Sequence, residues 1–396
     1  MAGIGSPPPF TPRFVLMKSF ACSLLACLLV IGAFSAPAQE PPAVPPAPQV
    51  AAKGYLLVDF STGNELAAAN ADERLEPASL TKIMSAYVIY RALAEGRVNL
   101  TDQVLISENA WRTGGSKMFV EVGKQVLMED LLKGMIIQSG NDASVALAEH
   151  VAGSEQTFAE LMNAHAKRLG MNNSHFTNAT GLPDPEHYTT ARDIALVTAA
   201  LIREFPDYYV WDGTKEFEYN GIKQQNRNRL LWRDPTVDGV KTGFTQNAGY
   251  CLVASAKRDG MRLISVVLGS AGPEARAEAS LELLNYGFRF YESHRLYPVG
   301  EAVESLRVWK GDVEELPVGP ARDVVAIIPR GRYDQLSARL EKAPELQAPI
   351  AKGARIGDIV VNLQEQELLR VPLVALQDVG VGSLWQRAKD TVLQWF

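Results

Sequence analysis

Between positions 51 and 293, the spacing of apolar residues predicts strands near both ends of the segment and helices between them. Apolar runs at 54–60 and 65–69 flank a Ser-Thr-Gly-Asn turn, and those at 250–256 and 261–269 flank an Asp-Gly turn, which predicts two hairpins. Helical spacing of apolar positions predicts helices over 79–95, 128–138, 142–151, 156–169, 191–204 and 275–291. This order predicts an α+β domain whose terminal strands share one sheet.

Beyond that segment the pattern changes to short strands separated by turns that contain Gly and Pro. We expect strands at 302–308, 324–329, 356–363 and 368–376, and a domain boundary near His294. These strands predict a β-rich domain over 294–381. The last segment, 383–396, is instead expected to form an amphipathic helix, whose apolar face carries Leu384, Trp385, Ala388, Val392, Trp395 and Phe396.

The first fifty residues have the pattern of a leader and a tether. Lys18 precedes an apolar stretch over 20–34, and Ala-Pro-Ala at 36–38 offers small residues to a signal peptidase. We predict a signal peptide over 1–38, in which translation starts at Met17 and residues 1–16 are an upstream extension. A retained membrane anchor is the alternative, but about 20 apolar residues are needed to span a bilayer. The prolines that follow predict a stiff tether over 39–50.

Size, charge and cysteine content narrow the function. A chain of 396 residues predicts two or three folded units. It carries 39 basic and 45 acidic side chains without a basic block, so we expect no nucleic-acid partner. Cys22 and Cys27 lie in the leader, which leaves Cys251 alone and excludes an internal disulfide framework.

The first candidate for chemistry is a Ser-x-x-Lys motif, Ser79 and Lys82, at the start of a predicted apolar helix. A separation of three residues places the lysine amine above the serine hydroxyl on one helix face. A serine nucleophile needs a neighbour that takes its proton, and a lysine can do so only as the neutral amine. Burial among Leu80, Ile83 and Met84 would lower the pKa of Lys82 toward that form. Taken alone, the same spacing also occurs on ordinary helices with a surface lysine.

Two further motifs follow along the chain. Ser139-Gly-Asn141 lies in a break between two predicted helices, and Lys241-Thr-Gly243 precedes the strand that begins at Tyr250. Alone they describe a turn and an edge strand. In a site, however, a glycine permits close approach of a substrate backbone, while the Thr hydroxyl and the Lys charge can bind a carboxylate. The three motifs in this order, on a helix start, an interhelical loop and a strand, are far less expected by chance than any one of them.

With these motifs the sequence resembles the penicillin-binding protein and serine β-lactamase superfamily. Within it, the chain is similar to the low-molecular-mass D-alanyl-D-alanine carboxypeptidases of the penicillin-binding protein 5/6 type, peptidase family S11. The matching stretches are 77–84, 139–143, 176–182 with 188–193, and 237–243, so the similarity spans nearly the whole mature chain. The resemblance implies a penicillin-binding protein/β-lactamase-like α+β domain over 51–293, an antiparallel sheet flanked by helices, followed by the β-rich domain and an anchor helix.

The resemblance also implies roles for the residues of the motifs. Ser79 would attack the carbonyl between the last two D-alanines of a peptidoglycan stem peptide and form an acyl-enzyme that water hydrolyses. Lys82 would be the general base for acylation. Ser139, Asn141 and Lys241 would relay protons and orient the substrate amide.

The terminal carboxylate of the substrate and the oxyanion would be bound near the third motif. Thr242 and Arg227 would bind the substrate carboxylate, and Gly243 would lie beside them. The neighbouring Arg229 could take the carboxylate-binding role instead of Arg227. The backbone N–H groups of Ser79 and Phe244 would form the oxyanion hole. Family members often carry histidine at the position of Phe244. Because the oxyanion donor at this position is the backbone N–H, the change of side chain affects how the substrate fits rather than whether the donor is present.

Other chemistries have less support in the sequence. The five histidines lack the spacing of a zinc site and no G-x-S-x-G elbow is present. We therefore expect no metal and no cofactor, and surface or structural roles for the histidines. In class A β-lactamases, the glutamate of an E-x-x-L-N motif between the second and third motifs supports hydrolysis of the acyl-enzyme. This sequence has no such motif there, so turnover of penicillin should be slow. A D,D-endopeptidase, a weak β-lactamase and a silent peptidoglycan-binding scaffold are the alternatives, and the oligomeric state stays open.

The leader and the last helix imply a location. We expect a periplasmic protein attached peripherally to the inner membrane through 383–396, with aromatic residues at the headgroups and Arg387 and Lys389 near the phosphates. A helix that packs back on the β-rich domain is the alternative. The expected partners are stem peptides ending in D-Ala-D-Ala and β-lactams as covalent inhibitors, in peptidoglycan maturation and cell-shape control.

Overall fold

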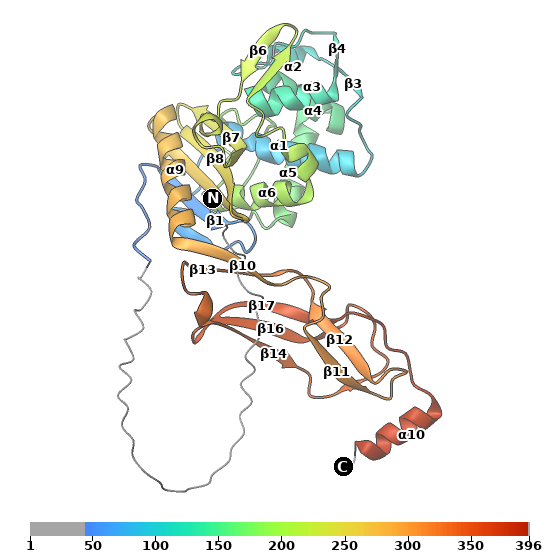
Figure 1. Cartoon of the computed structure of the whole chain (residues 1–396). Coiled ribbons are helices and arrows are strands. Elements are labelled where there is room, and N and C mark those ends of the chain that lie inside the picture. The colour runs from blue at the N-terminus through green and yellow to red at the C-terminus, as the bar shows by residue number, and fades with distance from the viewer. Residues whose placement is uncertain (1–43, 395–396) are drawn as a thin grey trace, which may run out of the picture. The chain divides into compact units, whose positions relative to one another are not determined.

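The computed structural model describes residues 44–394, which form two compact units divided between Phe290 and Tyr291. The predicted signal peptide, the start of the tether, Trp395 and Phe396 lie outside the described residues. Figure 1 shows the first unit as a sheet with helices and the second as a set of strands with one terminal helix. The α+β fold class and the β-rich second part are confirmed.

The first unit is built on a five-stranded antiparallel sheet in the order β2-β1-β9-β8-β7. Its strands are β1 (Gly54–Asp59), β2 (Glu65–Ala69), β7 (Val237–Thr245), β8 (Gly249–Arg258) and β9 (Met261–Ser270). Both predicted hairpins are present, with Tyr55 opposite Ala69 and Arg258 opposite Met261. The strands from the two ends of the unit therefore share one sheet, as predicted, and β7, which carries the third motif, lies at its edge.

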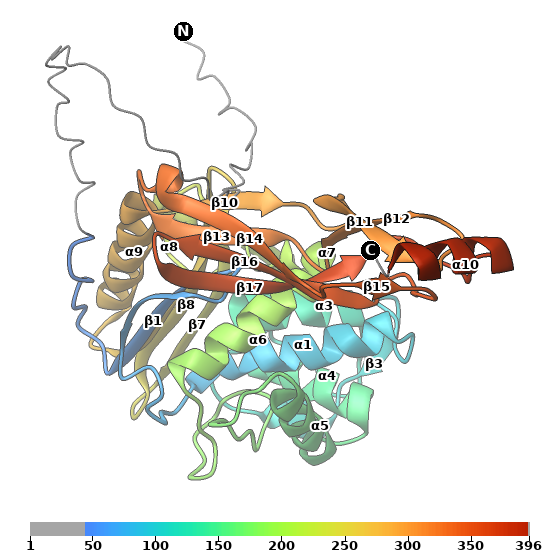
Figure 2. The same ribbon diagram turned by 90° about the horizontal axis from the view of Figure 1, so that it is seen from below.

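Alternation along β1 assigns the two faces of this sheet. Leu56 and Val58 belong to the main core with the helical part of the unit, while Leu57 faces α9 (Pro273–Phe290). Gly287 lets this helix approach, because a Cβ there would lie 2.4 Å from Leu263 Cδ1. Figure 2 shows α9 and α6 (Ala191–Glu204) against the sheet. Period-two burial of this kind is expected for strands covered on both faces.

The helical part surrounds α1 (Thr81–Ala94), which is buried along almost its whole length and preceded by a short 3₁₀ turn, η1 (Ala78–Leu80). The other predicted helices are present as α3, which continues into the π-helical stretch η2, then α4 and α5. The short elements α2, α7, α8 and β3 to β6, of three to five residues each, were not predicted, because they are too short to show a period. The bounds are α2 (Glu108–Arg112), α3 (Met128–Lys133), η2 (Gly134–Gln138), α4 (Asn141–Ala152), α5 (Glu155–Arg168), α7 (Pro206–Tyr209), α8 (Leu230–Arg233), β3 (Gln103–Leu105), β4 (Gln125–Leu127), β5 (Glu216–Tyr219) and β6 (Ile222–Gln225).

The second unit is a β-domain with its own core. A six-stranded sheet has the order β14-β16-β17-β12-β11-β15, and β10 pairs with β13. Val361, Val371 and Leu373 are fully buried in it. The predicted strands correspond to β11, β13, β16 and β17. The bounds are β10 (Tyr291–Tyr297), β11 (Glu304–Trp309), β12 (Glu315–Pro320), β13 (Val324–Pro329), η3 (Tyr333–Gln335), β14 (Leu336–Lys342), β15 (Leu346–Gln347), β16 (Arg355–Leu363) and β17 (Gln366–Ala375).

The terminal helix α10 (Leu384–Leu393) begins with a capping box formed by Ser383 and Gln386. It contacts the second unit through its polar side, where Asp390 is 7% exposed and accepts the Lys310 N–H at 2.5 Å. Leu384 and Trp385 are instead 82% and 83% exposed. The helix thus packs on the domain and presents apolar side chains outward at the same time.

Candidate active site

The first motif brings a serine and a lysine together within one helical turn. Ser79 lies in η1, and Lys82 Nζ lies 3.1 Å from Ser79 Oγ. The same amine donates to Asn141 Oδ1 and to the Thr180 carbonyl, both at 2.7 Å. Lys82 is only 1% exposed, although it carries an ionisable group. The two side chains point toward each other because residues three apart share a helix face.

Burial is the main cause that holds the pKa of Lys82 well below the usual lysine value. The charges of Lys241 and Arg227 lower this pKa further, while Asp142 and Glu155 act in the opposite direction. Desolvation and nearby positive charge both disfavour the ammonium. Both causes favour the neutral amine, which is the form that can accept a proton from Ser79.

Two glycines allow other segments to close on the turn that carries the serine. Gly181 has φ +82°, and a Cβ there would lie 1.8 Å from the Ala78 carbonyl oxygen. A Cβ at Gly243 would lie 3.0 Å from the Pro77 carbonyl oxygen and 3.2 Å from Ser79 N. The glycine of the third motif thus permits close approach of strand β7 to the protein's own Ser79 turn. The close approach that we predicted for a substrate backbone is thus made here by the protein's own chain.

The second motif lies where η2 ends. Ser139 has φ 68° and ends this element in the left-handed region, so that Asn141 begins α4 beside the amine of Lys82. The amide of Asn141 also donates to the Gly114 carbonyl at 2.7 Å, which fixes its orientation. Ser139 Oγ is buried without a hydrogen-bond partner among residues 44–394. This hydroxyl is thus free to bond with a substrate or a water.

The third motif lies along edge strand β7. Lys241 is 4% exposed and its amine donates to the Thr242 carbonyl at 3.3 Å. Burial, together with the charge of Arg227, lowers the pKa of Lys241 to about 7, although Asp212 raises it. Phe244 is half exposed and its ring lies 4.3 Å from that of Tyr250. Both lysines of the site are therefore buried and easily neutralised.

The arginines around the site differ in what they contact. Arg227 lines the site cavity and has no hydrogen-bond or ion-pair partner in the described part of the chain. Arg229 instead bonds Glu274 at 2.9 Å and does not line this cavity. Arg276, which the sequence analysis missed, donates to the carbonyls of Gly243 and Cys251 at 2.9 and 3.2 Å. No motif marks Arg276, because it becomes a site residue only where α9 packs against β7 and β8.

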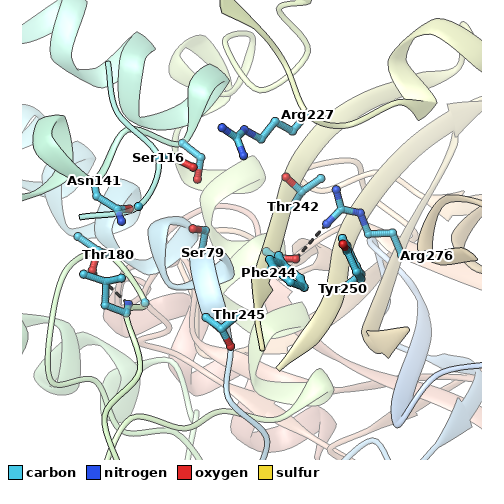
Figure 3. Close-up of a pocket in the computed structure, with 15 residues that line it drawn as sticks. Ser79, Ser116, Asn141, Thr180, Arg227, Thr242, Phe244, Thr245, Tyr250 and Arg276 are labelled. Carbon is cyan, nitrogen blue, oxygen red and sulfur yellow. Dashed lines mark hydrogen bonds between the residues drawn. The ribbon is translucent and has the colours of Figure 1, made fainter. Parts of the chain in front are cut away.

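Figure 3 shows how these residues surround Ser79, with Thr242, Arg227 and Arg276 on one side and Asn141 and Thr180 on the other. They enclose a cavity of about 500 Å³. Lys82 and Lys241 lie behind its wall rather than in it. The predicted residues that line it are Ser79, Ser139, Asn141, Arg227, Thr242, Gly243 and Phe244, and the lining residues not predicted are Gly115, Ser116, Thr180, Gly181, Leu182, Thr245, Tyr250 and Arg276.

Asp142 was also missed, although it follows the second motif directly. Its carboxylate accepts the N–H groups of Met118 and Phe119 at 2.8 and 2.9 Å. These bonds hold the loop that brings Gly115 and Ser116 to the cavity. An Asp in the first helical turn after a loop is a recognisable signal, because its carboxylate can bond free N–H groups.

Two buried side chains near the site, those of His187 and Cys251, have structural rather than chemical roles. His187 is buried, its Nδ1 accepts the Thr177 N–H, and its Nε2 lies 2.8 Å from Thr81 Oγ1. Burial lowers the pKa of His187 to about 4, so it stays neutral and ties this segment to the start of α1. Cys251 is fully buried, and burial raises the pKa of its thiol. Within residues 44–394, no group of His, Cys, Asp or Glu is placed to hold a metal ion.

Comparison with known proteins decides the family. Residues 40–272 match the model of the D-alanyl-D-alanine carboxypeptidases, Peptidase_S11. The chain belongs to this family. Residues 291–381 match the model of the penicillin-binding protein 5 C-terminal domain. The predicted family and serine-type D-Ala-D-Ala carboxypeptidase activity are thereby confirmed.

Individual relatives agree with this assignment. D-alanyl-D-alanine carboxypeptidase DacC of Escherichia coli is 44% identical over 88% of this chain and 90% of its own length. The crystal structure of penicillin-binding protein 5 from Haemophilus influenzae has a TM-score of 0.81 at 43% identity, covering 85% of this chain and 100% of that one. Penicillin-binding protein D2 from Listeria monocytogenes in its ampicillin-bound form has a TM-score of 0.57 at 29% identity, covering 61% and 100%.

Proposed function

We propose that this carboxypeptidase removes the terminal D-alanine from peptidoglycan pentapeptide stems through an acyl-enzyme on Ser79. The observation that carries the proposal is the buried Lys82 amine 3.1 Å from Ser79 Oγ, at a cavity of about 500 Å³. A buried base beside a hydroxyl that opens into a cavity is the arrangement that nucleophilic catalysis needs.

In acylation, Lys82 takes the proton of Ser79 as Oγ attacks the carbonyl of the penultimate D-alanine. The oxyanion forms between the backbone N–H groups of Ser79 and Phe244. Gly243 supports this assignment, because a Cβ at this position would lie 3.2 Å from Ser79 N. The glycine therefore lets strand β7 lie close to the N–H of Ser79. Preorganised donors of this kind stabilise the developing charge in a site with little water.

In the next step, the peptide bond breaks and the amine of D-alanine leaves with a proton. Ser139 is suited to relay that proton, because its hydroxyl is buried beside the cavity without a partner in the described chain. Asn141, held by Lys82 and by the Gly114 carbonyl, can orient the substrate amide. Water then hydrolyses the ester on Ser79 and restores the enzyme.

The substrate carboxylate is proposed to bind on the side of Thr242. Arg227 has no partner among residues 44–394 and lines the cavity there, while Lys241, buried behind the cavity wall, adds positive charge when it is protonated. Charge-assisted bonds to a carboxylate are strong where water is largely excluded. A β-lactam carries a carbonyl and a carboxylate in a comparable relation, so it should acylate Ser79 and be released slowly. The Listeria relative is described in an ampicillin-bound form.

We place the enzyme in the periplasm, on the outer face of the inner membrane, where it would act in peptidoglycan maturation and cell-shape control. Among the described residues, no helix is both long and apolar enough to cross a membrane. Peripheral attachment through α10 is supported by the outward position of Leu384 and Trp385, since aromatic and aliphatic side chains suit the interfacial region.

The test combines intact-mass spectrometry after penicillin exposure with D-alanine release from a monomeric pentapeptide. The wild-type chain should gain one penicillin mass on the peptide that contains Ser79, and Ser79→Ala should lose both adduct and activity. Ser61→Ala, in an exposed turn of the same unit, is the matched control and should keep both. An adduct on another residue, or no adduct and no released D-alanine, would instead support the silent scaffold.

A further inference from the structure

Glu155 is a partly buried carboxylate that the proposed mechanism does not use. It is the first residue of α5, which Ser154 caps by accepting the Thr157 N–H at 3.1 Å. An acidic residue in the first turn of a helix is common, because the helix dipole favours negative charge there. Glu155 also bonds outside its helix, since its Oε1 accepts the N–H of Ala179 at 3.0 Å, 24 residues farther along the chain. This bond links the start of α5 to a segment that continues into the lining of the active-site cavity.

The residue that Glu155 holds lies directly before the carbonyl that contacts Lys82. Ala179 is fully buried, and its own carbonyl accepts the Ser85 hydroxyl of α1 at 2.7 Å. The next carbonyl, that of Thr180, accepts the Lys82 amine at 2.7 Å. Ala179 is therefore fixed at its N–H from α5 and at its carbonyl from α1. Because the peptide that follows is planar, these two bonds limit where the Thr180 carbonyl can point.

The direction of the Thr180 carbonyl matters for the orientation of the base. Figure 3 shows Thr180 and Asn141 on the same side of Ser79, and both accept N–H groups of the Lys82 amine. If the Thr180 carbonyl moved, the amine would turn and its lone pair would no longer face Ser79 Oγ. A small displacement of a reacting group from its working geometry can slow a reaction by about tenfold or more.

Glu155 also acts on Lys82 through its charge. Burial lowers the pKa of Lys82, and the cations Lys241 and Arg227 lower it further, whereas Asp142 and Glu155 raise it. When Lys82 takes the serine proton it becomes a buried cation, and an anion nearby offsets part of the cost of that charge. Glu155 therefore favours the state that the base reaches during acylation.

The same interaction affects Glu155 itself. Burial raises the pKa of Glu155 and Glu149 raises it further, whereas its backbone hydrogen bond and the charge of Lys82 lower it. His187, whose pKa the charge of Lys82 also lowers, has a pKa of about 4, mainly because it is buried, and is neutral at higher pH. Asp142 bonds backbone N–H groups of a different loop. Glu155 thus combines a charge that favours the Lys82 cation with a hydrogen bond to the segment that contacts its amine.

We propose that Glu155 is a positioning residue for acylation: its carboxylate holds the Thr180 carbonyl in place on Lys82 and stabilises the cation that Lys82 becomes when it takes the proton of Ser79. This inference deepens the proposed function and rests on Lys82 as the base. No bond to Glu155 forms or breaks. The proton moves from Ser79 Oγ to Lys82 Nζ while Oγ bonds to the carbonyl carbon of the substrate.

Two substitutions separate the hydrogen bond from the charge. Glu155→Gln keeps an oxygen that accepts the Ala179 N–H and removes the charge, whereas Glu155→Ala removes both. Stopped-flow acylation of the full chain by penicillin, between pH 5 and pH 9, measures each variant. In Glu155→Gln the rising limb should move to lower pH by about 0.5 pH unit, because loss of the anion lowers the pKa of Lys82, and the plateau rate should stay within about threefold. In Glu155→Ala the plateau rate should fall about tenfold.

Glu160 supplies the matched control, because it is an exposed glutamate of the same helix. Glu160→Gln and Glu160→Ala should keep the wild-type rate and pH profile. Urea unfolding of each variant identifies a purely structural role. Lost stability alone reduces the amount of folded enzyme, but it does not move the pH limb of the acylation rate per active site.

The outcomes separate this inference from the proposed function. A Glu155→Gln profile that matches the wild type would overturn the role of the charge. A wild-type plateau rate in Glu155→Ala would overturn the positioning of the Thr180 carbonyl. Either result leaves acylation of Ser79, and with it the proposed function, intact, whereas a wild type that forms no adduct on Ser79 would overturn both together.

Discussion

Lys82 Nζ lies 3.1 Å from Ser79 Oγ and at the same time donates to two fixed acceptors, Asn141 Oδ1 and the Thr180 carbonyl. A neutral amine has two N–H groups, and these two acceptors use both of them. The remaining lone pair is then available to the serine hydroxyl. The contacts of Lys82 thus match the protonation state that a general base requires.

Acylation by penicillin should increase with pH through the pKa of Lys82. Burial lowers that pKa well below the usual value, and below it the amine is protonated and cannot accept the serine proton. Lys82→Met should reduce the acylation rate by about a thousandfold and remove this rising limb. Stopped-flow acylation between pH 5 and pH 9 measures both effects. Lys167→Met, at an exposed position of α5, should retain the wild-type profile.

Asp212 should control how Lys241 binds the substrate carboxylate. This buried carboxyl raises the pKa of Lys241, while Arg227 and Arg276 lower it. Burial raises the pKa of Asp212 itself to about 8, a value that the charge of Lys241 lowers and the charge of Asp238 raises. The ionised fraction of Asp212 favours the charged lysine, so Asp212→Asn should lower the pKa of Lys241 below about 7.

The readout for Asp212→Asn is the pH dependence of KM for the pentapeptide. KM should rise as Lys241 loses its charge, and in the variant this rise should begin at lower pH than in the wild type. Asp207→Asn, an exposed change in α7 on the same segment, should leave the profile unchanged. An unchanged profile in Asp212→Asn would contradict the coupling.

Gly181 should be essential for closing the site. An alanine there combines φ +82° with a Cβ 1.8 Å from the Ala78 carbonyl, so Gly181→Ala should cost about 3 kcal/mol of unfolding free energy and slow acylation. Gly96 has φ +68° but nothing within 4 Å of a built Cβ, so Gly96→Ala should cost only about 1 kcal/mol and leave acylation intact. Urea unfolding and penicillin labelling measure the two effects, and equal losses would argue against the steric cause.

The outer face of α10 should mediate membrane attachment. Leu384→Ser/Trp385→Ser removes side chains that are 82% and 83% exposed, so binding to vesicles with anionic lipids should fall by about tenfold or more. Thermal unfolding should not change, because neither side chain supports the domain. Trp111→Ser removes an exposed tryptophan of the first unit and should leave vesicle binding unaffected. Undiminished binding by the double variant would assign α10 a purely structural role.

Much of the fold could be predicted because its signals are local. The hairpin of β8 and β9 follows from an Asp-Gly turn between apolar runs, and α6 has the predicted bounds Ala191–Glu204. Strands β12 and β14 were missed, since Gly, Pro and charged residues interrupt their apolar pattern. In the helical projection of 383–396, Asp390 lies opposite the apolar residues, yet it is buried and accepts the Lys310 N–H. A helical projection shows which residues share a face but not what that face contacts.

The sequence by itself determined that Ser79 and Lys82 meet, because helical geometry sets the distance between residues three apart wherever the helix lies. It also determined the order of the three motifs, and with it the family. Only the tertiary structure decided that Arg276 reaches the Gly243 carbonyl, that Thr180 holds the lysine amine and that Ser139 keeps an unpartnered hydroxyl within the described chain. Such contacts join segments far apart in the chain, and burial and pKa depend on everything packed around a group, which no local pattern records.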